Sequence, residues 1–161
     1  MATYRRRVRV AAPFEDVWEF HSKISGLDAL TPAFMNLRID SVTGPDGEVD
    51  PEILEAGTTI EMSVRPFGVG PRQPWVARIE EREANLDAGR ARFVDTMESG
   101  PFPTWRHTHR FYESGDETVV DDEVRYELPG GSLGRVASPL GWVGFDPMFR
   151  MRHRTTKQLL E

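Results

Sequence analysis

Alternating apolar and polar residues mark the segment 93–112, FVDTMESGPFPTWRHTHRFY, as two neighbouring strands. Successive side chains of a strand point to opposite sides, so every second residue shares a face. The stretch 99–101 between the two halves, Ser-Gly-Pro, supplies turn residues and predicts a hairpin. The residues on the more apolar face are Phe93, Asp95, Met97, Trp105, His107, His109 and Phe111.

Three polar side chains interrupt this face: Asp95, His107 and His109. Buried polar groups need hydrogen-bonding partners, because burying them without partners costs free energy. These three side chains therefore either satisfy one another in a structural cluster or face a cavity that holds a ligand.

Period-two patterns predict further strands on both sides of this hairpin. Each predicted strand has one apolar face, and the strand at 118–128 carries a single carboxylate, Asp122, on that face. The strand at 3–10 places Arg5, Arg7 and Arg9 on its other face, which is typical of an edge strand. The predicted strands outside the hairpin cover residues 3–10, 36–43, 58–64, 75–83 and 118–128.

A helical pattern begins at Pro13 and predicts a short helix that ends near residues 25–26. Its apolar stripe contains Phe14, Val17 and Trp18, whereas His21 is expected to be a surface or packing residue. A second short helix is expected at 27–30, and Thr31-Pro32 ends it.

Two more helices are expected after residue 130. Ser132 is the expected N-cap of a short helix from Leu133, and Asp146-Pro147 is the expected start of a final helix that runs to about Leu160. The inner face of the final helix is predicted to hold Phe145, Met148, Phe149, Arg152, Thr156 and Leu159. Its outer face is predicted to hold Arg150, His153, Arg154 and Lys157.

The bulk composition excludes several classes of protein. The 161 residues are 39% hydrophobic and 29% charged, which is typical of one globular domain spanning 1–161. The net charge of −6 argues against nucleic acid as a partner, and the absence of cysteine excludes disulfides and thiolate chemistry. No run approaches the roughly 18 apolar residues of a membrane span, so we expect a cytoplasmic protein without integral membrane association.

The predicted order is one strand, two short helices, six strands and a C-terminal helix. Five segments accompany this order: PFEDVWEFH (13–21), LDALTPAFMNLRI (27–39), FVDTMESGPFPTWRHTHRF (93–111), YELPGGSLG (126–134) and RMRHRTTKQLL (150–160). Together, the order and the segments resemble the START/Bet v 1-like (SRPBCC) superfamily, including its polyketide cyclase/dehydrase and lipid-transport branch. The resemblance implies an α+β helix-grip fold, in which a seven-stranded curved antiparallel sheet wraps around a long C-terminal helix and leaves an apolar cavity.

The cavity implied by this resemblance would be lined by the inner faces of the predicted strands and of the last helix. Asp95, His107 and His109 would supply its polar end. Arg152 is expected either to pair with a carboxylate or to contact an anionic group of a ligand. Alternatively, the inner side chains simply fill the space. The other expected ligand-binding residues are Trp75, Phe93, Trp105, Phe111, Asp122, Tyr126, Phe145, Met148, Phe149 and Arg152.

Our main interpretation is a protein that binds an apolar or amphipathic small molecule, such as a lipid, polyketide or isoprenoid, for carriage, sequestration or sensing. One alternative is a cyclase/dehydratase-type enzyme in which Asp95 orients His107 or His109 for acid-base chemistry. Another is a protein-interaction module that modulates a partner. The sequence carries no signature of oligomeric state.

A metal site is the remaining chemical candidate. His107 and His109 lie two residues apart on one strand, which places their Cβ atoms about 7 Å apart on the same side. Asp95 or Asp122 would complete a mononuclear site. No HExxH signature is present, and the resembling family does not in general depend on metal, so the sequence predicts neither metal nor cofactor.

Overall fold

The computed structural model describes all residues 1–161 and contains seven strands and four α-helices. The strands are β1 (Ala2–Val10), β2 (Arg38–Thr43), β3 (Thr59–Val64), β4 (Gln73–Asn85), β5 (Arg90–Ser99), β6 (Thr104–Ser114) and β7 (Glu117–Glu127). The α-helices are α1 (Phe14–His21), α2 (Ile24–Leu30), α3 (Gly131–Ala137) and α4 (Trp142–Leu160). Three 3-10 turns, η1 (Ala33–Met35), η2 (Pro66–Gly68) and η3 (Ser138–Gly141), complete the chain.

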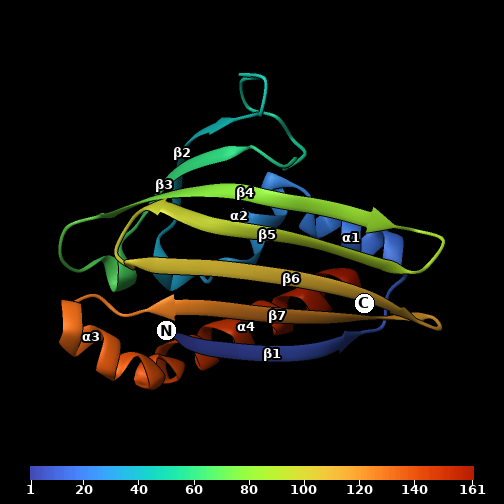
Figure 1. Cartoon of the computed structure of the whole chain (residues 1–161). Coiled ribbons are helices and arrows are strands. Elements are labelled where there is room, and N and C mark those ends of the chain that lie inside the picture. Colours follow the sequence, from blue (N-terminus) through green and yellow to red (C-terminus); the bar gives the residue numbers. More distant parts are fainter.

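All seven strands form one antiparallel sheet in the order β1-β7-β6-β5-β4-β3-β2 (Figure 1). The predicted hairpin at 93–112 is confirmed as β5 and β6 at the centre of this sheet. β1 lies at one edge, as its arginines predicted. Two of them, Arg5 and Arg7, bind the buried carboxylate of Asp121 on β7 from the outer face at 2.6 and 2.7 Å.

The helices α1, α2 and α4 cover the same face of the sheet (Figure 1). The predicted stripe of α1 is confirmed, because Phe14, Val17 and Trp18 are buried against the sheet. The observed architecture is therefore the expected α+β helix-grip fold. None of the helices is both long and apolar enough to cross a bilayer.

The apolar core is divided into three clusters of buried side chains. One joins α1 to β5 and β6 around Phe93, a second joins β1, β6 and β7 to α4 around Phe149, and the third lies under β3 and β4 around Ile60. A sheet that curves around one helix leaves room between such clusters.

The starts of the last helices differ from the sequence-based expectation. α3 begins at Gly131 after Gly130, whose φ of 111° suits glycine, and Ser132 does not cap it. α4 begins at Trp142 instead of Asp146, so Pro147 lies inside the helix. The carboxylate of Asp146 accepts hydrogen bonds from Tyr4 and Arg150, and these side-chain bonds compete with a capping role.

The first helix and the inner face of α4 also need correction. α1 ends at His21, not near residue 25, and α2 already begins at Ile24. On α4, His153 is buried although it was expected outside, whereas Leu159 is 54% exposed although it was expected inside. The observed buried residues of α4 are Phe145, Phe149, His153 and Thr156.

Candidate functional site

A cavity of about 350 Å³ lies between the sheet and the helices. Hydrophobic residues supply 18 of the 27 that line it, so it suits an apolar ligand body. Its walls include Phe93, Phe149 and Ile60, one from each of the three core clusters. The lining residue Gly144 on α4 is exposed, which places it at the opening.

Most of the residues predicted from the sequence to form the site line this cavity. They come from β4, β5 and β6 on the sheet side and from α4 on the other side. They are Trp75, Phe93, Asp95, Trp105, His107, His109, Phe145, Met148, Phe149 and Arg152.

Three predicted ligand-binding residues do not line the cavity. Phe111 is fully buried, and the rings of Trp18 and His21 on α1 cover it. Tyr126 packs edge-on against Phe145, and its hydroxyl donates to the Ser138 carbonyl at 2.7 Å. Asp122 is 1% exposed and lies behind the imidazoles that it binds.

Sequence reasoning missed other parts of the site. The segment from α2 to η1 forms a wall of the cavity that includes Leu30 and Phe34. His21 also lines the cavity, and its burial rules out the surface position considered for it. His153 was missed, although Phe145, Phe149 and His153 share an i, i+4, i+8 spacing that places them on one helix face.

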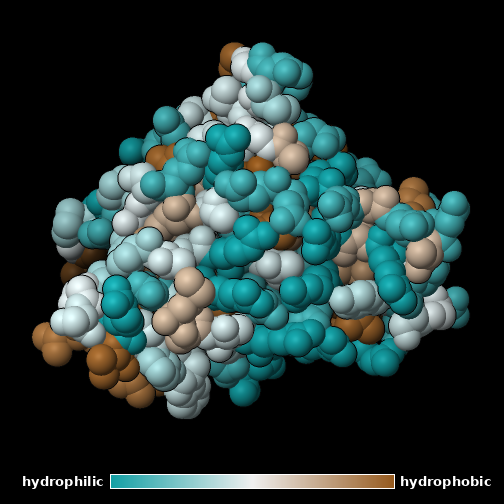
Figure 2. Space-filling model, in the orientation of Figure 1, coloured by the Kyte–Doolittle hydropathy of each residue, from teal (hydrophilic) through white to brown (hydrophobic).

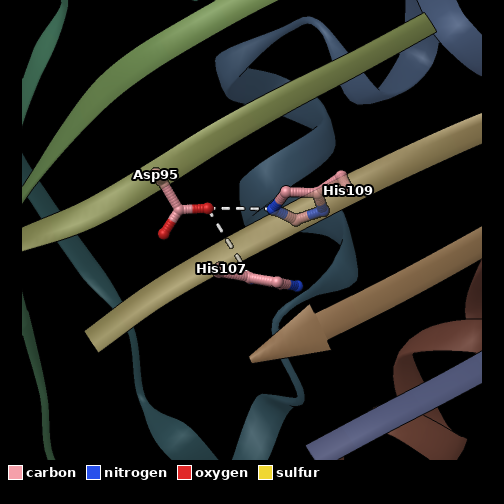
Figure 3. Close-up of side chains that lie close together, drawn as sticks. All are labelled: Asp95, His107 and His109. Carbon is pink, nitrogen blue, oxygen red and sulfur yellow. Dashed lines mark hydrogen bonds and ion pairs between the residues drawn. The ribbon is translucent and has the colours of Figure 1, made fainter. Parts of the chain in front are cut away.

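Strand pairing brings the polar residues of the site together (Figure 3). Asp95 on β5 is paired with His107 on β6, and His109 is paired with Asp122 on β7. The Nε2–H of His109 donates to Asp95 Oδ2 at 2.9 Å, and His107 Nδ1 lies 3.6 Å from the same oxygen. The two imidazole rings are 3.6 Å apart between centroids, so they form one compact unit.

Asp122 holds this unit from behind. Its Oδ1 accepts a hydrogen bond from His107 Nε2 at 2.9 Å, and its Oδ2 accepts one from His153 Nε2 at 2.6 Å. His109 Nδ1 lies 3.0 Å from Oδ1 but out of line for a good hydrogen bond. One buried carboxylate therefore connects the strand imidazoles to α4.

The charges of this cluster shift the pKa values of its members. Burial lowers the pKa of His107, and the neighbouring His109 lowers it further. Burial also acts against a charged His109, but the carboxylates of Asp122 and Asp95 outweigh it and raise the pKa of His109. Burial opposes ionisation of Asp122, yet its three imidazole partners hold its pKa well below the usual range. The cluster thus combines the buried carboxylate of Asp122 and the partly buried one of Asp95 with a histidine that favours its charged form.

Arg152 supplies a cation to the same cavity. No carboxylate lies within salt-bridge distance of its guanidinium, so the ion pair considered for it is not formed. Together with burial, its charge lowers the pKa of His21 to about 3. Two further donors, the indole N–H groups of Trp75 and Trp105, are buried without a partner among the cavity-lining residues. The cavity therefore offers several unused donors to oxygen atoms of a ligand.

One group of residues in the cavity has the composition of a metal site. The side chains of Asp95, His107 and His109 each offer a ligand atom, and these atoms lie within 4.8 Å of one another. Imidazole nitrogen and carboxylate oxygen are common ligands of divalent transition metals.

Solved structures with the same fold come from several organisms. A protein from Chromobacterium violaceum has a TM-score of 0.67 at 16% identity, covering 100% of this chain and 99% of that one. A protein from Thermus thermophilus has a TM-score of 0.65 at 18% identity, covering 98% and 95%. Norcoclaurine synthase from Thalictrum flavum, in complex with dopamine and hydroxybenzaldehyde, has a TM-score of 0.63 at 17% identity, covering 99% and 86%.

Sequence comparison gives a more specific result than these distant structural similarities, which show the fold alone. No curated protein matches the chain significantly. The model of the family described as "Polyketide cyclase / dehydrase and lipid transport" matches residues 10–152, nearly the whole chain. The chain belongs to the polyketide cyclase/dehydrase and lipid-transport family.

Proposed function

We propose that this protein binds an amphipathic small molecule in its internal cavity, for carriage, sequestration or sensing. The observation that supports this most directly is the cavity itself, with mainly hydrophobic walls and a small set of polar groups. A few convergent polar groups in an otherwise apolar pocket are typical of small-molecule sites. A lipid, a polyketide or an isoprenoid would match this combination.

The polar groups narrow the chemistry of the proposed ligand. Arg152 offers an unpaired cation, and Trp75 and Trp105 offer unpaired N–H donors. Each of these groups favours an oxygen acceptor, and Arg152 favours an anionic one. The cavity volume of about 350 Å³ lies near the lower end of the range for ligand sites, which is roughly 300–1,000 Å³. A compact ligand with an apolar body and an acidic or carbonyl end fits best.

Two fluorescent probes that differ in one group test this proposal. 8-Anilinonaphthalene-1-sulfonate is anionic, whereas N-phenyl-1-naphthylamine has the same aromatic body without the sulfonate. We expect both probes to bind the wild-type protein with one-to-one stoichiometry. Arg152→Met should weaken binding of the anionic probe about tenfold or more, because an unpaired, partly buried cation is lost, and should change binding of the neutral probe little.

Gly144→Phe provides the steric control. A Cβ atom at Gly144 meets no other atom within 4 Å, so a side chain can begin there without a clash. Because Gly144 lies at the opening, the phenyl group should reduce the binding of both probes. Probe affinities that are unchanged in both variants would contradict binding in the cavity.

A second candidate function is a cyclase or dehydratase reaction in the same cavity. The specific observation in its favour is that Asp95, His107 and His109 line the cavity as a hydrogen-bonded cluster. Such a pair of imidazole and carboxylate can move a proton to or from a bound carbonyl compound. His107→Ala separates the two functions, because an enzyme would lose turnover and keep ligand affinity, whereas a carrier would change mainly in affinity.

A further inference from the structure

The cavity side of the polar cluster has the geometry of a metal site. Asp95 Oδ2 lies 2.9 Å from His109 Nε2 and 3.6 Å from His107 Nδ1. A divalent ion with ligands at about 2.0–2.2 Å separates neighbouring ligand atoms by roughly 3.0–3.5 Å in octahedral or tetrahedral geometry. Small side-chain rotations are therefore enough to place all three atoms around one ion (Figure 3).

Asp122 provides the second observation, which is independent of these distances. A metal-binding imidazole usually donates its other N–H to a carboxylate, which fixes the tautomer and the ring orientation. Here His107 Nε2 and His109 Nδ1 lie 2.9 and 3.0 Å from the same oxygen of Asp122. In the metal-free protein His109 Nε2 carries the proton that it donates to Asp95, and a bound ion would displace that proton. With the remaining protons on His107 Nε2 and His109 Nδ1, the lone pairs of His107 Nδ1 and His109 Nε2 would then face the Asp95 side.

The surroundings fix which side of the imidazoles an ion can reach. Asp95, His107 and His109 line the cavity, whereas Asp122 does not and is held from behind by His153 on α4. An ion entering from the cavity therefore meets the Asp95 side first. The two negative charges of Asp95 and Asp122 balance the double positive charge of a divalent cation.

We propose that Asp95, His107 and His109 bind one divalent transition-metal ion, with Asp122 as the positioning residue behind the two imidazoles. Two imidazoles and one carboxylate suit Zn²⁺ or Fe²⁺ and leave coordination positions open towards the cavity. Arg152 in the same cavity favours an anionic oxygen group at those positions. This site departs from the metal-free expectation. That expectation depended on the absence of HExxH, a motif of helices and not of paired strands, and on a resembling family that does not in general depend on metal.

Titration of metal-stripped protein with Co²⁺ and Zn²⁺ tests the proposal. We expect one ion per chain, visible d–d absorption for Co²⁺, and calorimetric binding of Zn²⁺ that competes with it. Asp95→Asn, His107→Gln and His109→Gln should each weaken binding about 100-fold or more. Asp122→Asn should weaken it about 10- to 100-fold, because the imidazoles lose their orienting carboxylate. Asp116→Asn is the matched control, since Asp116 is an exposed carboxylate outside the cavity and the ligand set and its loss should leave affinity unchanged.

Folding of each variant is checked by circular dichroism. If a variant does not fold, X-ray absorption of the wild-type Co²⁺ complex decides, because two imidazoles plus carboxylate oxygen support the site and any other ligand set overturns it. Wild-type protein that binds no ion, or equal affinity in folded Asp95→Asn and His107→Gln, also overturns it. Protein that binds the fluorescent probes but no ion refutes only the metal site and leaves the proposed ligand-binding function standing.

Discussion

Among individual residues, Asp122 has the most demanding environment. Its side chain is 1% exposed, and its two oxygens accept hydrogen bonds from His107 on β6 and His153 on α4. A buried carboxylate is tolerated only when partners compensate for lost hydration. Removing the Asp122 carboxylate therefore leaves the imidazoles of His107 and His153 buried without their hydrogen-bond acceptor.

Asp122→Asn keeps the shape of the side chain and removes its charge. We expect the free energy of unfolding to fall by about 3–5 kcal/mol, as is usual when one member of a buried ionic network is lost. Urea unfolding monitored by circular dichroism measures this change. Asp146→Asn is the control, because this carboxylate also has several partners but is partly exposed. Its substitution should lower the free energy of unfolding by clearly less than Asp122→Asn does. Equal losses in the two variants would contradict the role of Asp122.

His21 predicts a pH dependence of stability. Burial and the charge of Arg152 lower the pKa of His21 to about 3, whereas the unfolded chain binds the proton near pH 6.5. Between these values the unfolded state carries one more proton than the folded state. Stability contributed by His21 is therefore present above pH 6.5 and is lost as pH falls, by at most about 1.4 kcal/mol per pH unit.

His21→Gln isolates this contribution, because glutamine does not titrate and can still hydrogen-bond the Val17 carbonyl as His21 does. Between pH 7 and pH 5 the wild type should lose about 2 kcal/mol more than the variant in urea unfolding. The lowered pKa of His107 acts in the same direction in both proteins and cancels in the difference. The same pH slope in both proteins would show that His21 is not buried in its neutral form.

The sequence identified four residues of the polar cluster, Asp95, His107, His109 and Asp122, because they lie on strand faces with period two. It placed His153 on the outside, since a helix stripe drawn from Phe149 through Arg152 competes with one drawn from Phe149 through His153. The two stripes lie next to each other, and packing against Asp122 selects the second. Which of two adjacent helix positions is buried depends on the partner surface, and the sequence of the helix does not contain that information.

At the scale of elements, the start of α4 makes a matched pair of substitutions possible. Gly141 and Gly144 are three residues apart, in η3 and α4. A Cβ atom at Gly141 would lie 2.5 Å from the buried ring of Tyr126, whereas one at Gly144 meets nothing within 4 Å. Both glycines have helical backbone angles, but only at Gly141 does a neighbouring side chain leave no room for a Cβ atom.

We expect Gly141→Ala to lower stability by about 1–3 kcal/mol, because the Tyr126 ring has no room to move. Gly144→Ala should raise it by about 0.5–1 kcal/mol, since alanine loses less backbone entropy on folding into a helix. Thermal unfolding of both variants measures the difference. Equal stability of Gly141→Ala and Gly144→Ala would contradict the close packing of η3 on β7 that the structure shows.

Strands were predicted better than helix ends for a physical reason. Alternation extends along a whole strand, so each strand is specified by many residues and only its ends are uncertain. A helix start depends on one or two residues, and Asp146 has competing partners in Tyr4, Arg6 and Arg150. The same sequence pattern that predicts an N-cap is here used to attach α4 to β1.

For the molecule as a whole, the family resemblance correctly predicted the fold and a cavity, but not all of its walls. Phe111 and Tyr126 point to the helix side, as their strand positions predicted, yet α1 and the segment before α4 cover them. Residues of α2 and η1 form the wall instead. Residues of α2 and η1 reach the cavity because the connection between β1 and β2 crosses this face of the sheet. No local sequence pattern specifies the course of that connection.

Exposed apolar side chains form a second surface to which an amphipathic ligand can adhere. They gather on the helical segment from α3 to the start of α4, which Figure 2 shows as a brown patch at the lower left. Leu133 and Val136 in this patch are each 81% exposed. Neither fluorescence nor stability of the wild-type protein alone separates binding there from binding in the cavity, but variants of the two surfaces do.

A ligand that binds the folded state and not the unfolded chain stabilises the whole molecule, and in the cavity it would contact all three core clusters. At a free concentration of 100 times Kd, 8-anilinonaphthalene-1-sulfonate should add about 2.7 kcal/mol to the free energy of unfolding. This corresponds to a rise in Tm of roughly 5–10 °C for a chain of this size. Gly144→Phe should abolish the rise, whereas Leu133→Ser with Val136→Ser should leave it intact. The opposite result, in which the serine pair abolishes the rise and Gly144→Phe does not, would place the ligand on the exposed patch and refute binding in the cavity.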